Sequence, residues 1–254
     1  MPDPRPRLLA VLIDADNVLA RHAEPILKEI STIGEPALRR VYGDWSSSAL
    51  AGWKNQARDL GLVMHQQSAN TKGKNASDIG LVIDAMDILH AGKFDGFVLV
   101  SSDSDFTRLA SRIREEGLEV VGIGEAKTPE SLRKVCNRFI LIENIVAEAE
   151  TDLPASPARQ AATPAPRSDA PAPATPVRKP MTDAIPLIFK AMKTIDPDSE
   201  WYHLGQLGQY MTRADPDFDS RTYGAAKLSD LIKGLPKRFE VKKDGNMLMV
   251  RDIA

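Results

Sequence analysis

Aspartates follow two apolar segments of the sequence at a spacing that suits metal binding. The segment LLAVLID ends in Asp14, and the segment FVLV is followed within five residues by Asp103 and Asp105. A fourth acid, Asp78, opens the segment SDIGLVID. Carboxylates that converge on one cleft repel one another unless a cation lies between them, and their oxygen atoms suit Mg²⁺ or Mn²⁺. A divalent ion held in this way supports the attack of water on a phosphodiester.

Neighbouring polar residues are expected to support these acids. Asp16 and Ser101 each lie beside one of the acidic runs. A simpler reading is open for any single acid, because one Asp after a strand is usually a turn former or a helix cap. Asp78 and Asp105 fit the favourable position of a negative charge at a helix N-terminus. Two D-x-D runs that each follow an apolar strand are harder to explain in that way.

The elements that must position the acids alternate between strand and helix patterns. Continuous apolar runs of strand length, typical of strands buried on both faces, alternate with segments of helical period. Five or six alternations predict an α/β fold with a mostly parallel sheet and helices on both faces. Ligands of such sheets bind outside the carboxyl ends of the strands, where the acids fall. The predicted strands are 8–14, 37–45, 62–67, 97–102, 118–124 and 140–144, and the predicted helices are 20–33, 46–61, 77–92, 105–117 and 129–139.

The composition changes abruptly after about Ala149. Residues 151–180 hold eight of the 18 prolines and almost no large apolar side chain, so they cannot bury enough surface to offset their ordering entropy. We therefore expect a disordered linker at 149–180 between a domain at 7–148 and a domain at 181–254. The excess of acidic residues lies in the first of these domains, and the rest of the chain is slightly basic.

Composition excludes several classes of protein. The 254-residue chain has one cysteine, Cys136, which cannot form an internal disulfide or a cysteine zinc cluster, so we expect a cytoplasmic location. No window approaches the roughly 20 apolar residues of a membrane span, and the N-terminal MPDPRPR lacks the apolar region of a signal peptide. The net charge of -2 argues against a strongly basic nucleic-acid binder, but a local site can assemble its own charge.

Four motifs occur in order along the first part of the chain: IDADN, KGKNASDIGLVID, SSDSDF and G-x-x-V-x-G-I-G. Together they cover about residues 7–146 and resemble the motifs of the NYN domain, a LabA-like branch of the PIN-like nuclease superfamily. The resemblance implies a three-layer α/β/α, Rossmann-like fold and metal-dependent ribonuclease chemistry. Many members of the family carry Gly where Ser102 stands. The site residues that the resemblance implies are Asp14, Asp78, Asp103 and Asp105 as metal-binding and catalytic acids and Asn17 as support for the first acid.

The C-terminal segment has the pattern of a winged helix. Helical patterns at 183–195, 204–213 and 225–235 precede two alternating strands around Asp244-Gly245, which is a strong hairpin signal. The segments FDSRT and YGAAKLSDLI and the closing hairpin resemble the LOTUS (OST-HTH) domain. That resemblance implies binding to RNA or docking to a protein partner.

Basic residues near the acids and on the winged helix are candidate RNA contacts. Lys72 and Lys74 lie just before Asp78, where they are placed to hold the phosphate backbone. A solvated surface charge is the alternative for each of them. The candidates of the winged helix are Arg221, Lys227, Lys233, Lys237, Lys242 and Lys243.

These features together predict a Mg²⁺- or Mn²⁺-dependent endoribonuclease that acts on single-stranded or structured RNA. The linker would raise the effective concentration of bound RNA near the cleft. Two alternatives stay open. The segment VLIDADNVL also resembles the opening of a haloacid-dehalogenase phosphatase with Asp14 as covalent nucleophile, although Asn17 replaces the usual Gly of that motif. The other alternative is a non-catalytic RNA-binding adaptor with a vestigial metal site, and the oligomeric state is open.

Overall fold

Six strands form one parallel sheet in the larger domain. The structure is a computed structural model, and it describes residues 5–66, 76–151 and 178–253. The strand order is β3-β2-β1-β4-β5-β6, and every neighbouring pair is parallel. The central strands are almost wholly buried, which explains their continuous apolar sequences. The strands are β1 (Leu8–Asp14), β2 (Glu35–Gly43), β3 (Val63–Gln66), β4 (Gly96–Val100), β5 (Glu119–Gly124) and β6 (Arg138–Leu141).

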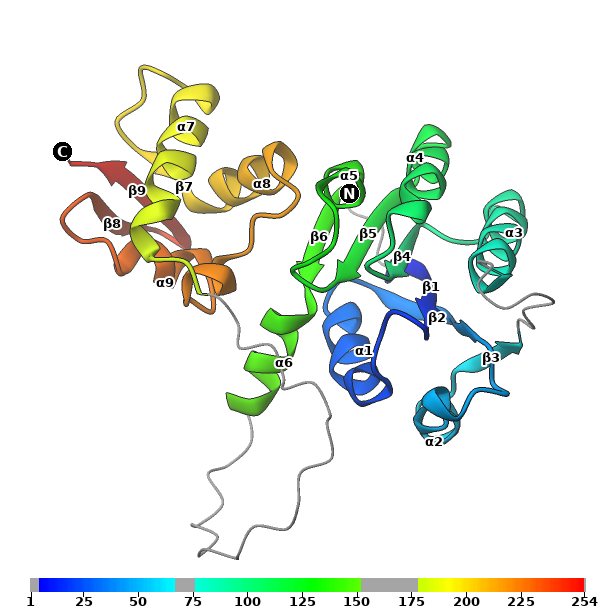
Figure 1. Cartoon of the computed structure of the whole chain (residues 1–254). Coiled ribbons are helices and arrows are strands. Elements are labelled where there is room, and N and C mark those ends of the chain that lie inside the picture. Colours follow the sequence, from blue (N-terminus) through cyan, green and yellow to red (C-terminus); the bar gives the residue numbers. More distant parts are fainter. Residues whose placement is uncertain (1–4, 67–75, 152–177, 254) are drawn as a thin grey trace, which may run out of the picture.

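Helices cover both faces of this sheet (Figure 1). Alternate residues of a strand point to opposite faces, so Val11 and Ile13 of β1 pack against α1, α2 and α6. Ala10 and Leu12 pack in a second core cluster with α3, α4 and α5. The predicted three-layer α/β/α fold is therefore confirmed. The helices are α1 (Ala23–Ser31), α2 (Gly52–Leu60), α3 (Ala76–His90), α4 (Thr107–Glu115), α5 (Glu130–Val135) and α6 (Ile142–Thr151).

The chain changes direction across the sheet between β1 and β4. The first three strands proceed from β1 to one edge, and the next three proceed from β4 to the other edge. Ile13 of β1 pairs with Val100 of β4, so Asp14 and Ser101 follow side by side at the carboxyl ends of these strands. Such a switch point is where parallel α/β sheets bind their ligands.

The C-terminal residues form a separate winged-helix domain with its own core. Three helices pack around buried residues such as Ile188, Leu207 and Leu231, and a small antiparallel sheet in the order β7-β9-β8 closes the domain. The hairpin turns at Gly245, whose φ of 57° is a conformation that favours glycine. The elements are α7 (Ile185–Ile195), β7 (Tyr202–His203), α8 (Leu204–Ala214), α9 (Leu228–Lys233), β8 (Phe239–Asp244) and β9 (Met247–Asp252).

Two elements differ from the prediction. Helix α6 begins at Ile142, where a strand to residue 144 was predicted, and it runs to Thr151, beyond the predicted start of the linker. Ile142 and Ile145 are buried against the α1 face of the sheet, and this packing stabilises the helix. Strand β7 has two residues, too few for a periodic pattern. The greater part of the predicted linker, 152–177, lies outside the described residues.

None of the helices in the described part of the chain is long and apolar enough to cross a membrane.

The winged-helix domain docks on the β6 edge of the parallel sheet and on α6 (Figure 1). The backbone N–H of Phe139 in β6 donates a hydrogen bond of 2.9 Å to the carbonyl oxygen of Pro216. Arg221 reaches across the interface and donates to Glu29 of α1 at 2.9 Å and to Glu148 of α6 at 2.7 Å. Its guanidinium also pairs with Asp219 of its own domain at 2.8 Å. Further contacts join Arg133 to Asp217 and Asn144 to Thr222.

We expect Arg221→Ala to separate the two domains. The side chains of Arg221 and Glu29 are each only 13% exposed, so the substitution leaves the poorly hydrated carboxylates of Glu29 and Asp219 without their closest cation. Loss of one partner from a buried ion pair costs about 3 kcal/mol. Small-angle scattering should then show a larger radius of gyration, and the winged-helix domain should melt at a lower temperature.

The matched control for this experiment is Arg112→Ala. Arg112 forms surface ion pairs with Glu115 and Glu116 within one helix, and such pairs contribute little to stability. Scattering and melting curves of Arg221→Ala that coincide with those of Arg112→Ala would show that Arg221 does not hold the domains together.

Candidate metal centre at the carboxyl ends of β1 and β4

Asp14 is a buried carboxylate held by three hydrogen bonds. Its side chain is at the end of β1, and the residue is 1% exposed. Oδ2 accepts from Asn17 Nδ2 at 2.6 Å and from Ser101 Oγ at 2.8 Å, and Oδ1 accepts from the backbone N–H of Asp16 at 3.1 Å. Burial raises the pKa of Asp14 above its ordinary value, although the hydrogen bonds from Ser101 and Asn17 oppose the rise. Asn17, Asp16 and Ser101, the three expected supporting residues, thus all donate hydrogen bonds to Asp14.

Ser101 links the ends of the two strands. While its hydroxyl donates to Asp14, the same Oγ accepts a 3.0 Å hydrogen bond from the backbone N–H of Asp103. The next turn is fixed in the same manner, because Asp103 Oδ1 accepts from the backbone N–H of Asp105 at 2.9 Å. Asp103 caps the short 3-10 helix Ser104–Phe106 that precedes α4. The backbone of the acidic turn after β4, and with it the Asp103 side chain, is therefore fixed relative to Asp14.

Three carboxylates come together beside Asp14. One oxygen of each of Asp78, Asp103 and Asp105 lies within 4.8 Å of the others. Asp78 stands in the first turn of α3, whose apolar face packs on the sheet, and this packing brings the helix N-terminus to the cluster. Asp14 does not belong to this group of three, but its charge acts on Asp78. All four predicted acids thus lie at one end of the sheet.

Among the four acids, Asp78 has the pKa that the neighbouring negative charges raise most clearly. Partial burial and the negative charges of Asp14, Asp103 and Asp105 raise the pKa of Asp78 to about 6. Each of these causes disfavours the ionised carboxylate, and a cation between the acids would remove the repulsion.

The donor set fits a hard divalent ion. Mg²⁺ binds oxygen ligands at about 2.1 Å, so ligands on opposite sides of one ion are about 4.2 Å apart. The carboxylate oxygens of Asp78, Asp103 and Asp105 lie within 4.8 Å of one another, which is close to this separation. No cysteine or histidine belongs to the cluster in the described part of the chain, and a purely oxygen site favours Mg²⁺ or Mn²⁺ over zinc.

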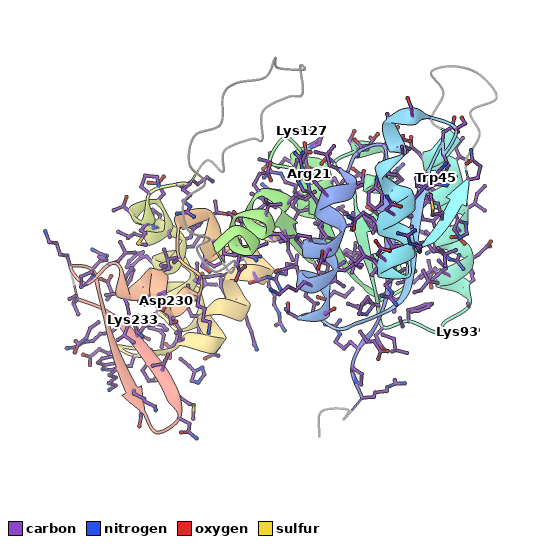
Figure 2. All side chains as sticks on the ribbon, turned by 90° about the horizontal axis from the view of Figure 1, so that it is seen from below. Arg21, Trp45, Lys93, Lys127, Asp230 and Lys233 are labelled. Carbon is purple, nitrogen blue, oxygen red and sulfur yellow. The ribbon has the colours of Figure 1, made fainter. Side chains whose placement is uncertain are left out.

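The expected RNA contacts lie in different places. Lys72 and Lys74 are outside the described residues. The prediction that Arg221 contacts RNA is wrong for this arrangement. The guanidinium of Arg221 donates hydrogen bonds to three carboxylates at the domain interface and is not available to RNA. Lys242 extends over the ring of Trp201, with its ammonium 3.8 Å from the ring centroid. The remaining candidates are exposed on the winged-helix domain. Lys227 and Lys233 lie at the two ends of α9, Lys237 follows this helix, and Lys243 lies in β8. Figure 2 labels Lys233.

The sequence analysis did not predict that His22, Glu125 and Glu143 come together near the carboxyl end of β5. Partial burial and the positive charge of the neighbouring Arg21 lower the pKa of His22, and the negative charges of Glu125 and Glu143 oppose this shift. Glu125 also connects to the acidic site, because its backbone N–H donates to Ser102 Oγ at 2.9 Å. His22 ends a short 3-10 helix after β1, Glu125 follows β5, and Glu143 lies in the first turn of α6, so no local motif could have brought them together. Figure 2 labels Arg21 and also Lys127, which pairs with Glu125 at 2.7 Å.

A parallel sheet of this order with acids at its switch point is the architecture of a PIN-like α/β/α domain. Comparison with protein families gives the same answer: the NYN domain matches residues 8–143, and the OST-HTH/LOTUS domain matches residues 176–250. The first match covers more than half of the chain, so the chain belongs to the NYN domain family. The family resemblance of both domains is thereby confirmed.

Two solved structures are similar to parts of the chain. The first is a protein of unknown function, VPA0982 from Vibrio parahaemolyticus RIMD 2210633, with 20% identity over 56% of this chain and 96% of that chain and a TM-score of 0.47. The second is the uncharacterized protein of gene locus NE0665 of Nitrosomonas europaea, with 28% identity over 38% of this chain and 92% of that chain and a TM-score of 0.26. No curated protein matches the chain.

We expect Asp78→Asn to stabilise the metal-free protein at high pH. The folded state raises the pKa of Asp78 from 3.8 to about 6, so its contribution to stability is present below about pH 4 and is lost as the pH rises through 6. The amide removes this loss, and in EDTA the variant should melt a few degrees above the wild type at about pH 8 and equally at about pH 4.

Asp87→Asn is the control, because Asp87 is exposed on the same helix. Its melting temperature should follow that of the wild type at both pH values. If Asp78→Asn melted at or below the wild-type temperature at about pH 8, Asp78 would not carry the repulsion of the cluster.

Proposed function

We propose that the protein is a metal-dependent endoribonuclease that hydrolyses RNA phosphodiester bonds. The observation that carries the proposal is the convergence of Asp78, Asp103 and Asp105 at the switch point of an NYN domain. Nuclease activity is the activity of this superfamily, and the second domain belongs to an RNA-binding class. The proposed substrate is single-stranded or structured RNA.

Asp78, Asp103 and Asp105 are the proposed ligands of Mg²⁺ or Mn²⁺, with Asp14 as the fourth acid of the site. When bound, such an ion polarises a phosphoryl oxygen and lowers the pKa of water. Two of the acids are oriented before any ligand arrives: Ser101 and Asn17 fix Asp14, and the backbone N–H of Asp105 fixes Asp103. Preorganised groups of this kind lose little entropy when the substrate binds.

The winged-helix domain is the proposed RNA-recognition module. Lys227, Lys242 and Lys243 are its proposed contacts, and Lys72 and Lys74 are proposed to hold the backbone beside the acids. The proposed first domain extends from residue 7 to the end of α6 at Thr151, three residues beyond the predicted limit of 148, and the proposed second domain keeps its limits of 181–254. A cytoplasmic location also belongs to the proposal, since a chain with one cysteine, Cys136, cannot form an internal disulfide.

The test is cleavage of a labelled RNA by the purified full chain with Mn²⁺ or Mg²⁺. Asp103→Asn should lower the rate by about 10²-fold or more, because it removes one negative ligand and changes the group that fixes the turn at Asp105. Asp87→Asn is the matched control and should cleave at the wild-type rate. EDTA should abolish cleavage by every variant.

Three outcomes would contradict the proposal. If the wild type binds RNA but leaves it intact with both metals, the protein is an RNA-binding adaptor. Equal cleavage by Asp103→Asn and the wild type would place the chemistry elsewhere. Trapping of beryllofluoride on Asp14, with loss of a phosphatase activity in Asp14→Asn, would identify a haloacid-dehalogenase-like phosphohydrolase.

A further inference from the structure

A groove with a volume of about 1220 Å³ runs between the two domains. Its NYN side is formed at the amino ends of β5 and β6 and the last turns of α4 and α5, and its other side is formed by α8 and the start of α9. The acids lie at the carboxyl ends of the strands, so the groove and the candidate metal centre are at opposite ends of the sheet. The groove is therefore a separate feature of the molecule.

The charge of the groove is positive although the whole chain is slightly acidic. Five cations and one carboxylate line it. The carboxylate, Glu119, is already paired with Arg7 outside the groove. Within the described residues, no carboxylate lies within ion-pair distance of three of the cations, all of them exposed: Arg114 on the NYN side and Arg213 and Lys227 on the winged-helix side. The other two cations are Lys134, which pairs with Glu130, and Arg138, which lies 3.8 Å from Glu29.

The lining of the groove indicates how an anion would be recognised. None of the described residues that line it is aromatic, so the groove offers no ring on which a base could stack. Leu204 and Leu228 lie in the lining together with the small residues Gly205 and Gly208 of α8. Positive side chains on both walls and no stacking platform suit contact with phosphates rather than readout of bases.

We propose that this interdomain groove binds the sugar–phosphate backbone of the RNA substrate, with phosphate contacts from both domains. The proposal rests on the proposed ribonuclease function, and it adds a second RNA site that is independent of sequence. β5 has six residues and spans about 20 Å, so RNA in the groove is held well away from the acids at the other end of the sheet. Only an RNA long enough to reach both sites can occupy the groove and the candidate metal centre at the same time.

The groove depends on the docking of the domains. Pro216 lines it, and the carbonyl oxygen of Pro216 accepts the hydrogen bond from Phe139 N–H that joins the winged helix to β6. Separation of the domains would remove one wall. Arg221 thus serves RNA binding by positioning the second domain, without itself touching RNA.

The test compares RNA binding by the full-length double variant Arg213→Ala/Lys227→Ala with binding by Lys54→Ala/Lys190→Ala. The control removes two exposed lysines, one from each domain, that do not line the groove. Fluorescence anisotropy with a labelled RNA of about 20 nucleotides, in EDTA, gives the affinity at several salt concentrations. Each lost phosphate contact should lower the salt slope by about 0.7, and the two together should weaken binding on the order of ten-fold at physiological salt.

A single substitution on the other wall, Arg114→Ala, should weaken binding roughly four-fold and should do so for RNAs of different sequence. This result would show that both domains contact the same RNA. A dinucleotide should bind the wild type and the double variant equally.

The outcomes separate this proposal from the proposed function. Wild-type affinity and salt slope in both groove variants would overturn the groove proposal, and the ribonuclease could still stand on its cleavage assay. Weaker binding by the groove variants together with an inactive wild type would support the groove and contradict the nuclease. If the full chain does not bind RNA, or if the groove instead binds an acidic protein and RNA binding is unaffected by its substitutions, the groove proposal is wrong.

Discussion

Repulsion between carboxylates at one end of the parallel sheet is the constraint on which the rest of the site depends. The change of direction between β1 and β4 brings Asp14 and the Asp103 turn together, and α3 adds Asp78. The fold meets this cost with local donors: Ser101 and Asn17 hold Asp14, and a backbone N–H holds Asp103. Partial burial and the remaining repulsion together raise the pKa of Asp78 to about 6. A site that is under strain without a cation and has only oxygen donors is suited to a divalent ion.

The second domain adds charge of the opposite sign. Arg221 neutralises Glu29 and Glu148 of the NYN domain and fixes the winged helix at the β6 edge. This docking creates a basic groove at the end of the sheet that is remote from the acids. An acidic site attracts a polyanion poorly, whereas a basic surface in a fixed position attracts the RNA electrostatically. The structure thereby changes our sequence-based picture of a tethered module, because the two domains share an interface.

Much of the fold could be predicted from the sequence, because buried parallel strands produce continuous apolar runs and their helices have a clear period. Asp14, Asp78, Asp103 and Asp105 could be named because they follow strand ends or open a helix. The role of Arg221 could not, since its partner Glu29 is 192 residues away and no local pattern joins them. Helix α6 was missed for a related reason: Ile142 and Ile145 are stabilised by tertiary packing. The groove could not be predicted from the sequence either, because its cations come from two domains.

Binding of Mn²⁺ to the full-length protein, followed by titration calorimetry, tests the central claim most directly. At about pH 8 the account predicts saturable binding that is lost in Asp103→Asn and unchanged in Asp87→Asn. Binding should weaken as the pH falls through 6, because protonation of Asp78 then competes with the ion. Absence of binding by the wild type, or equal binding by Asp103→Asn, would contradict the claim that these acids form a metal centre.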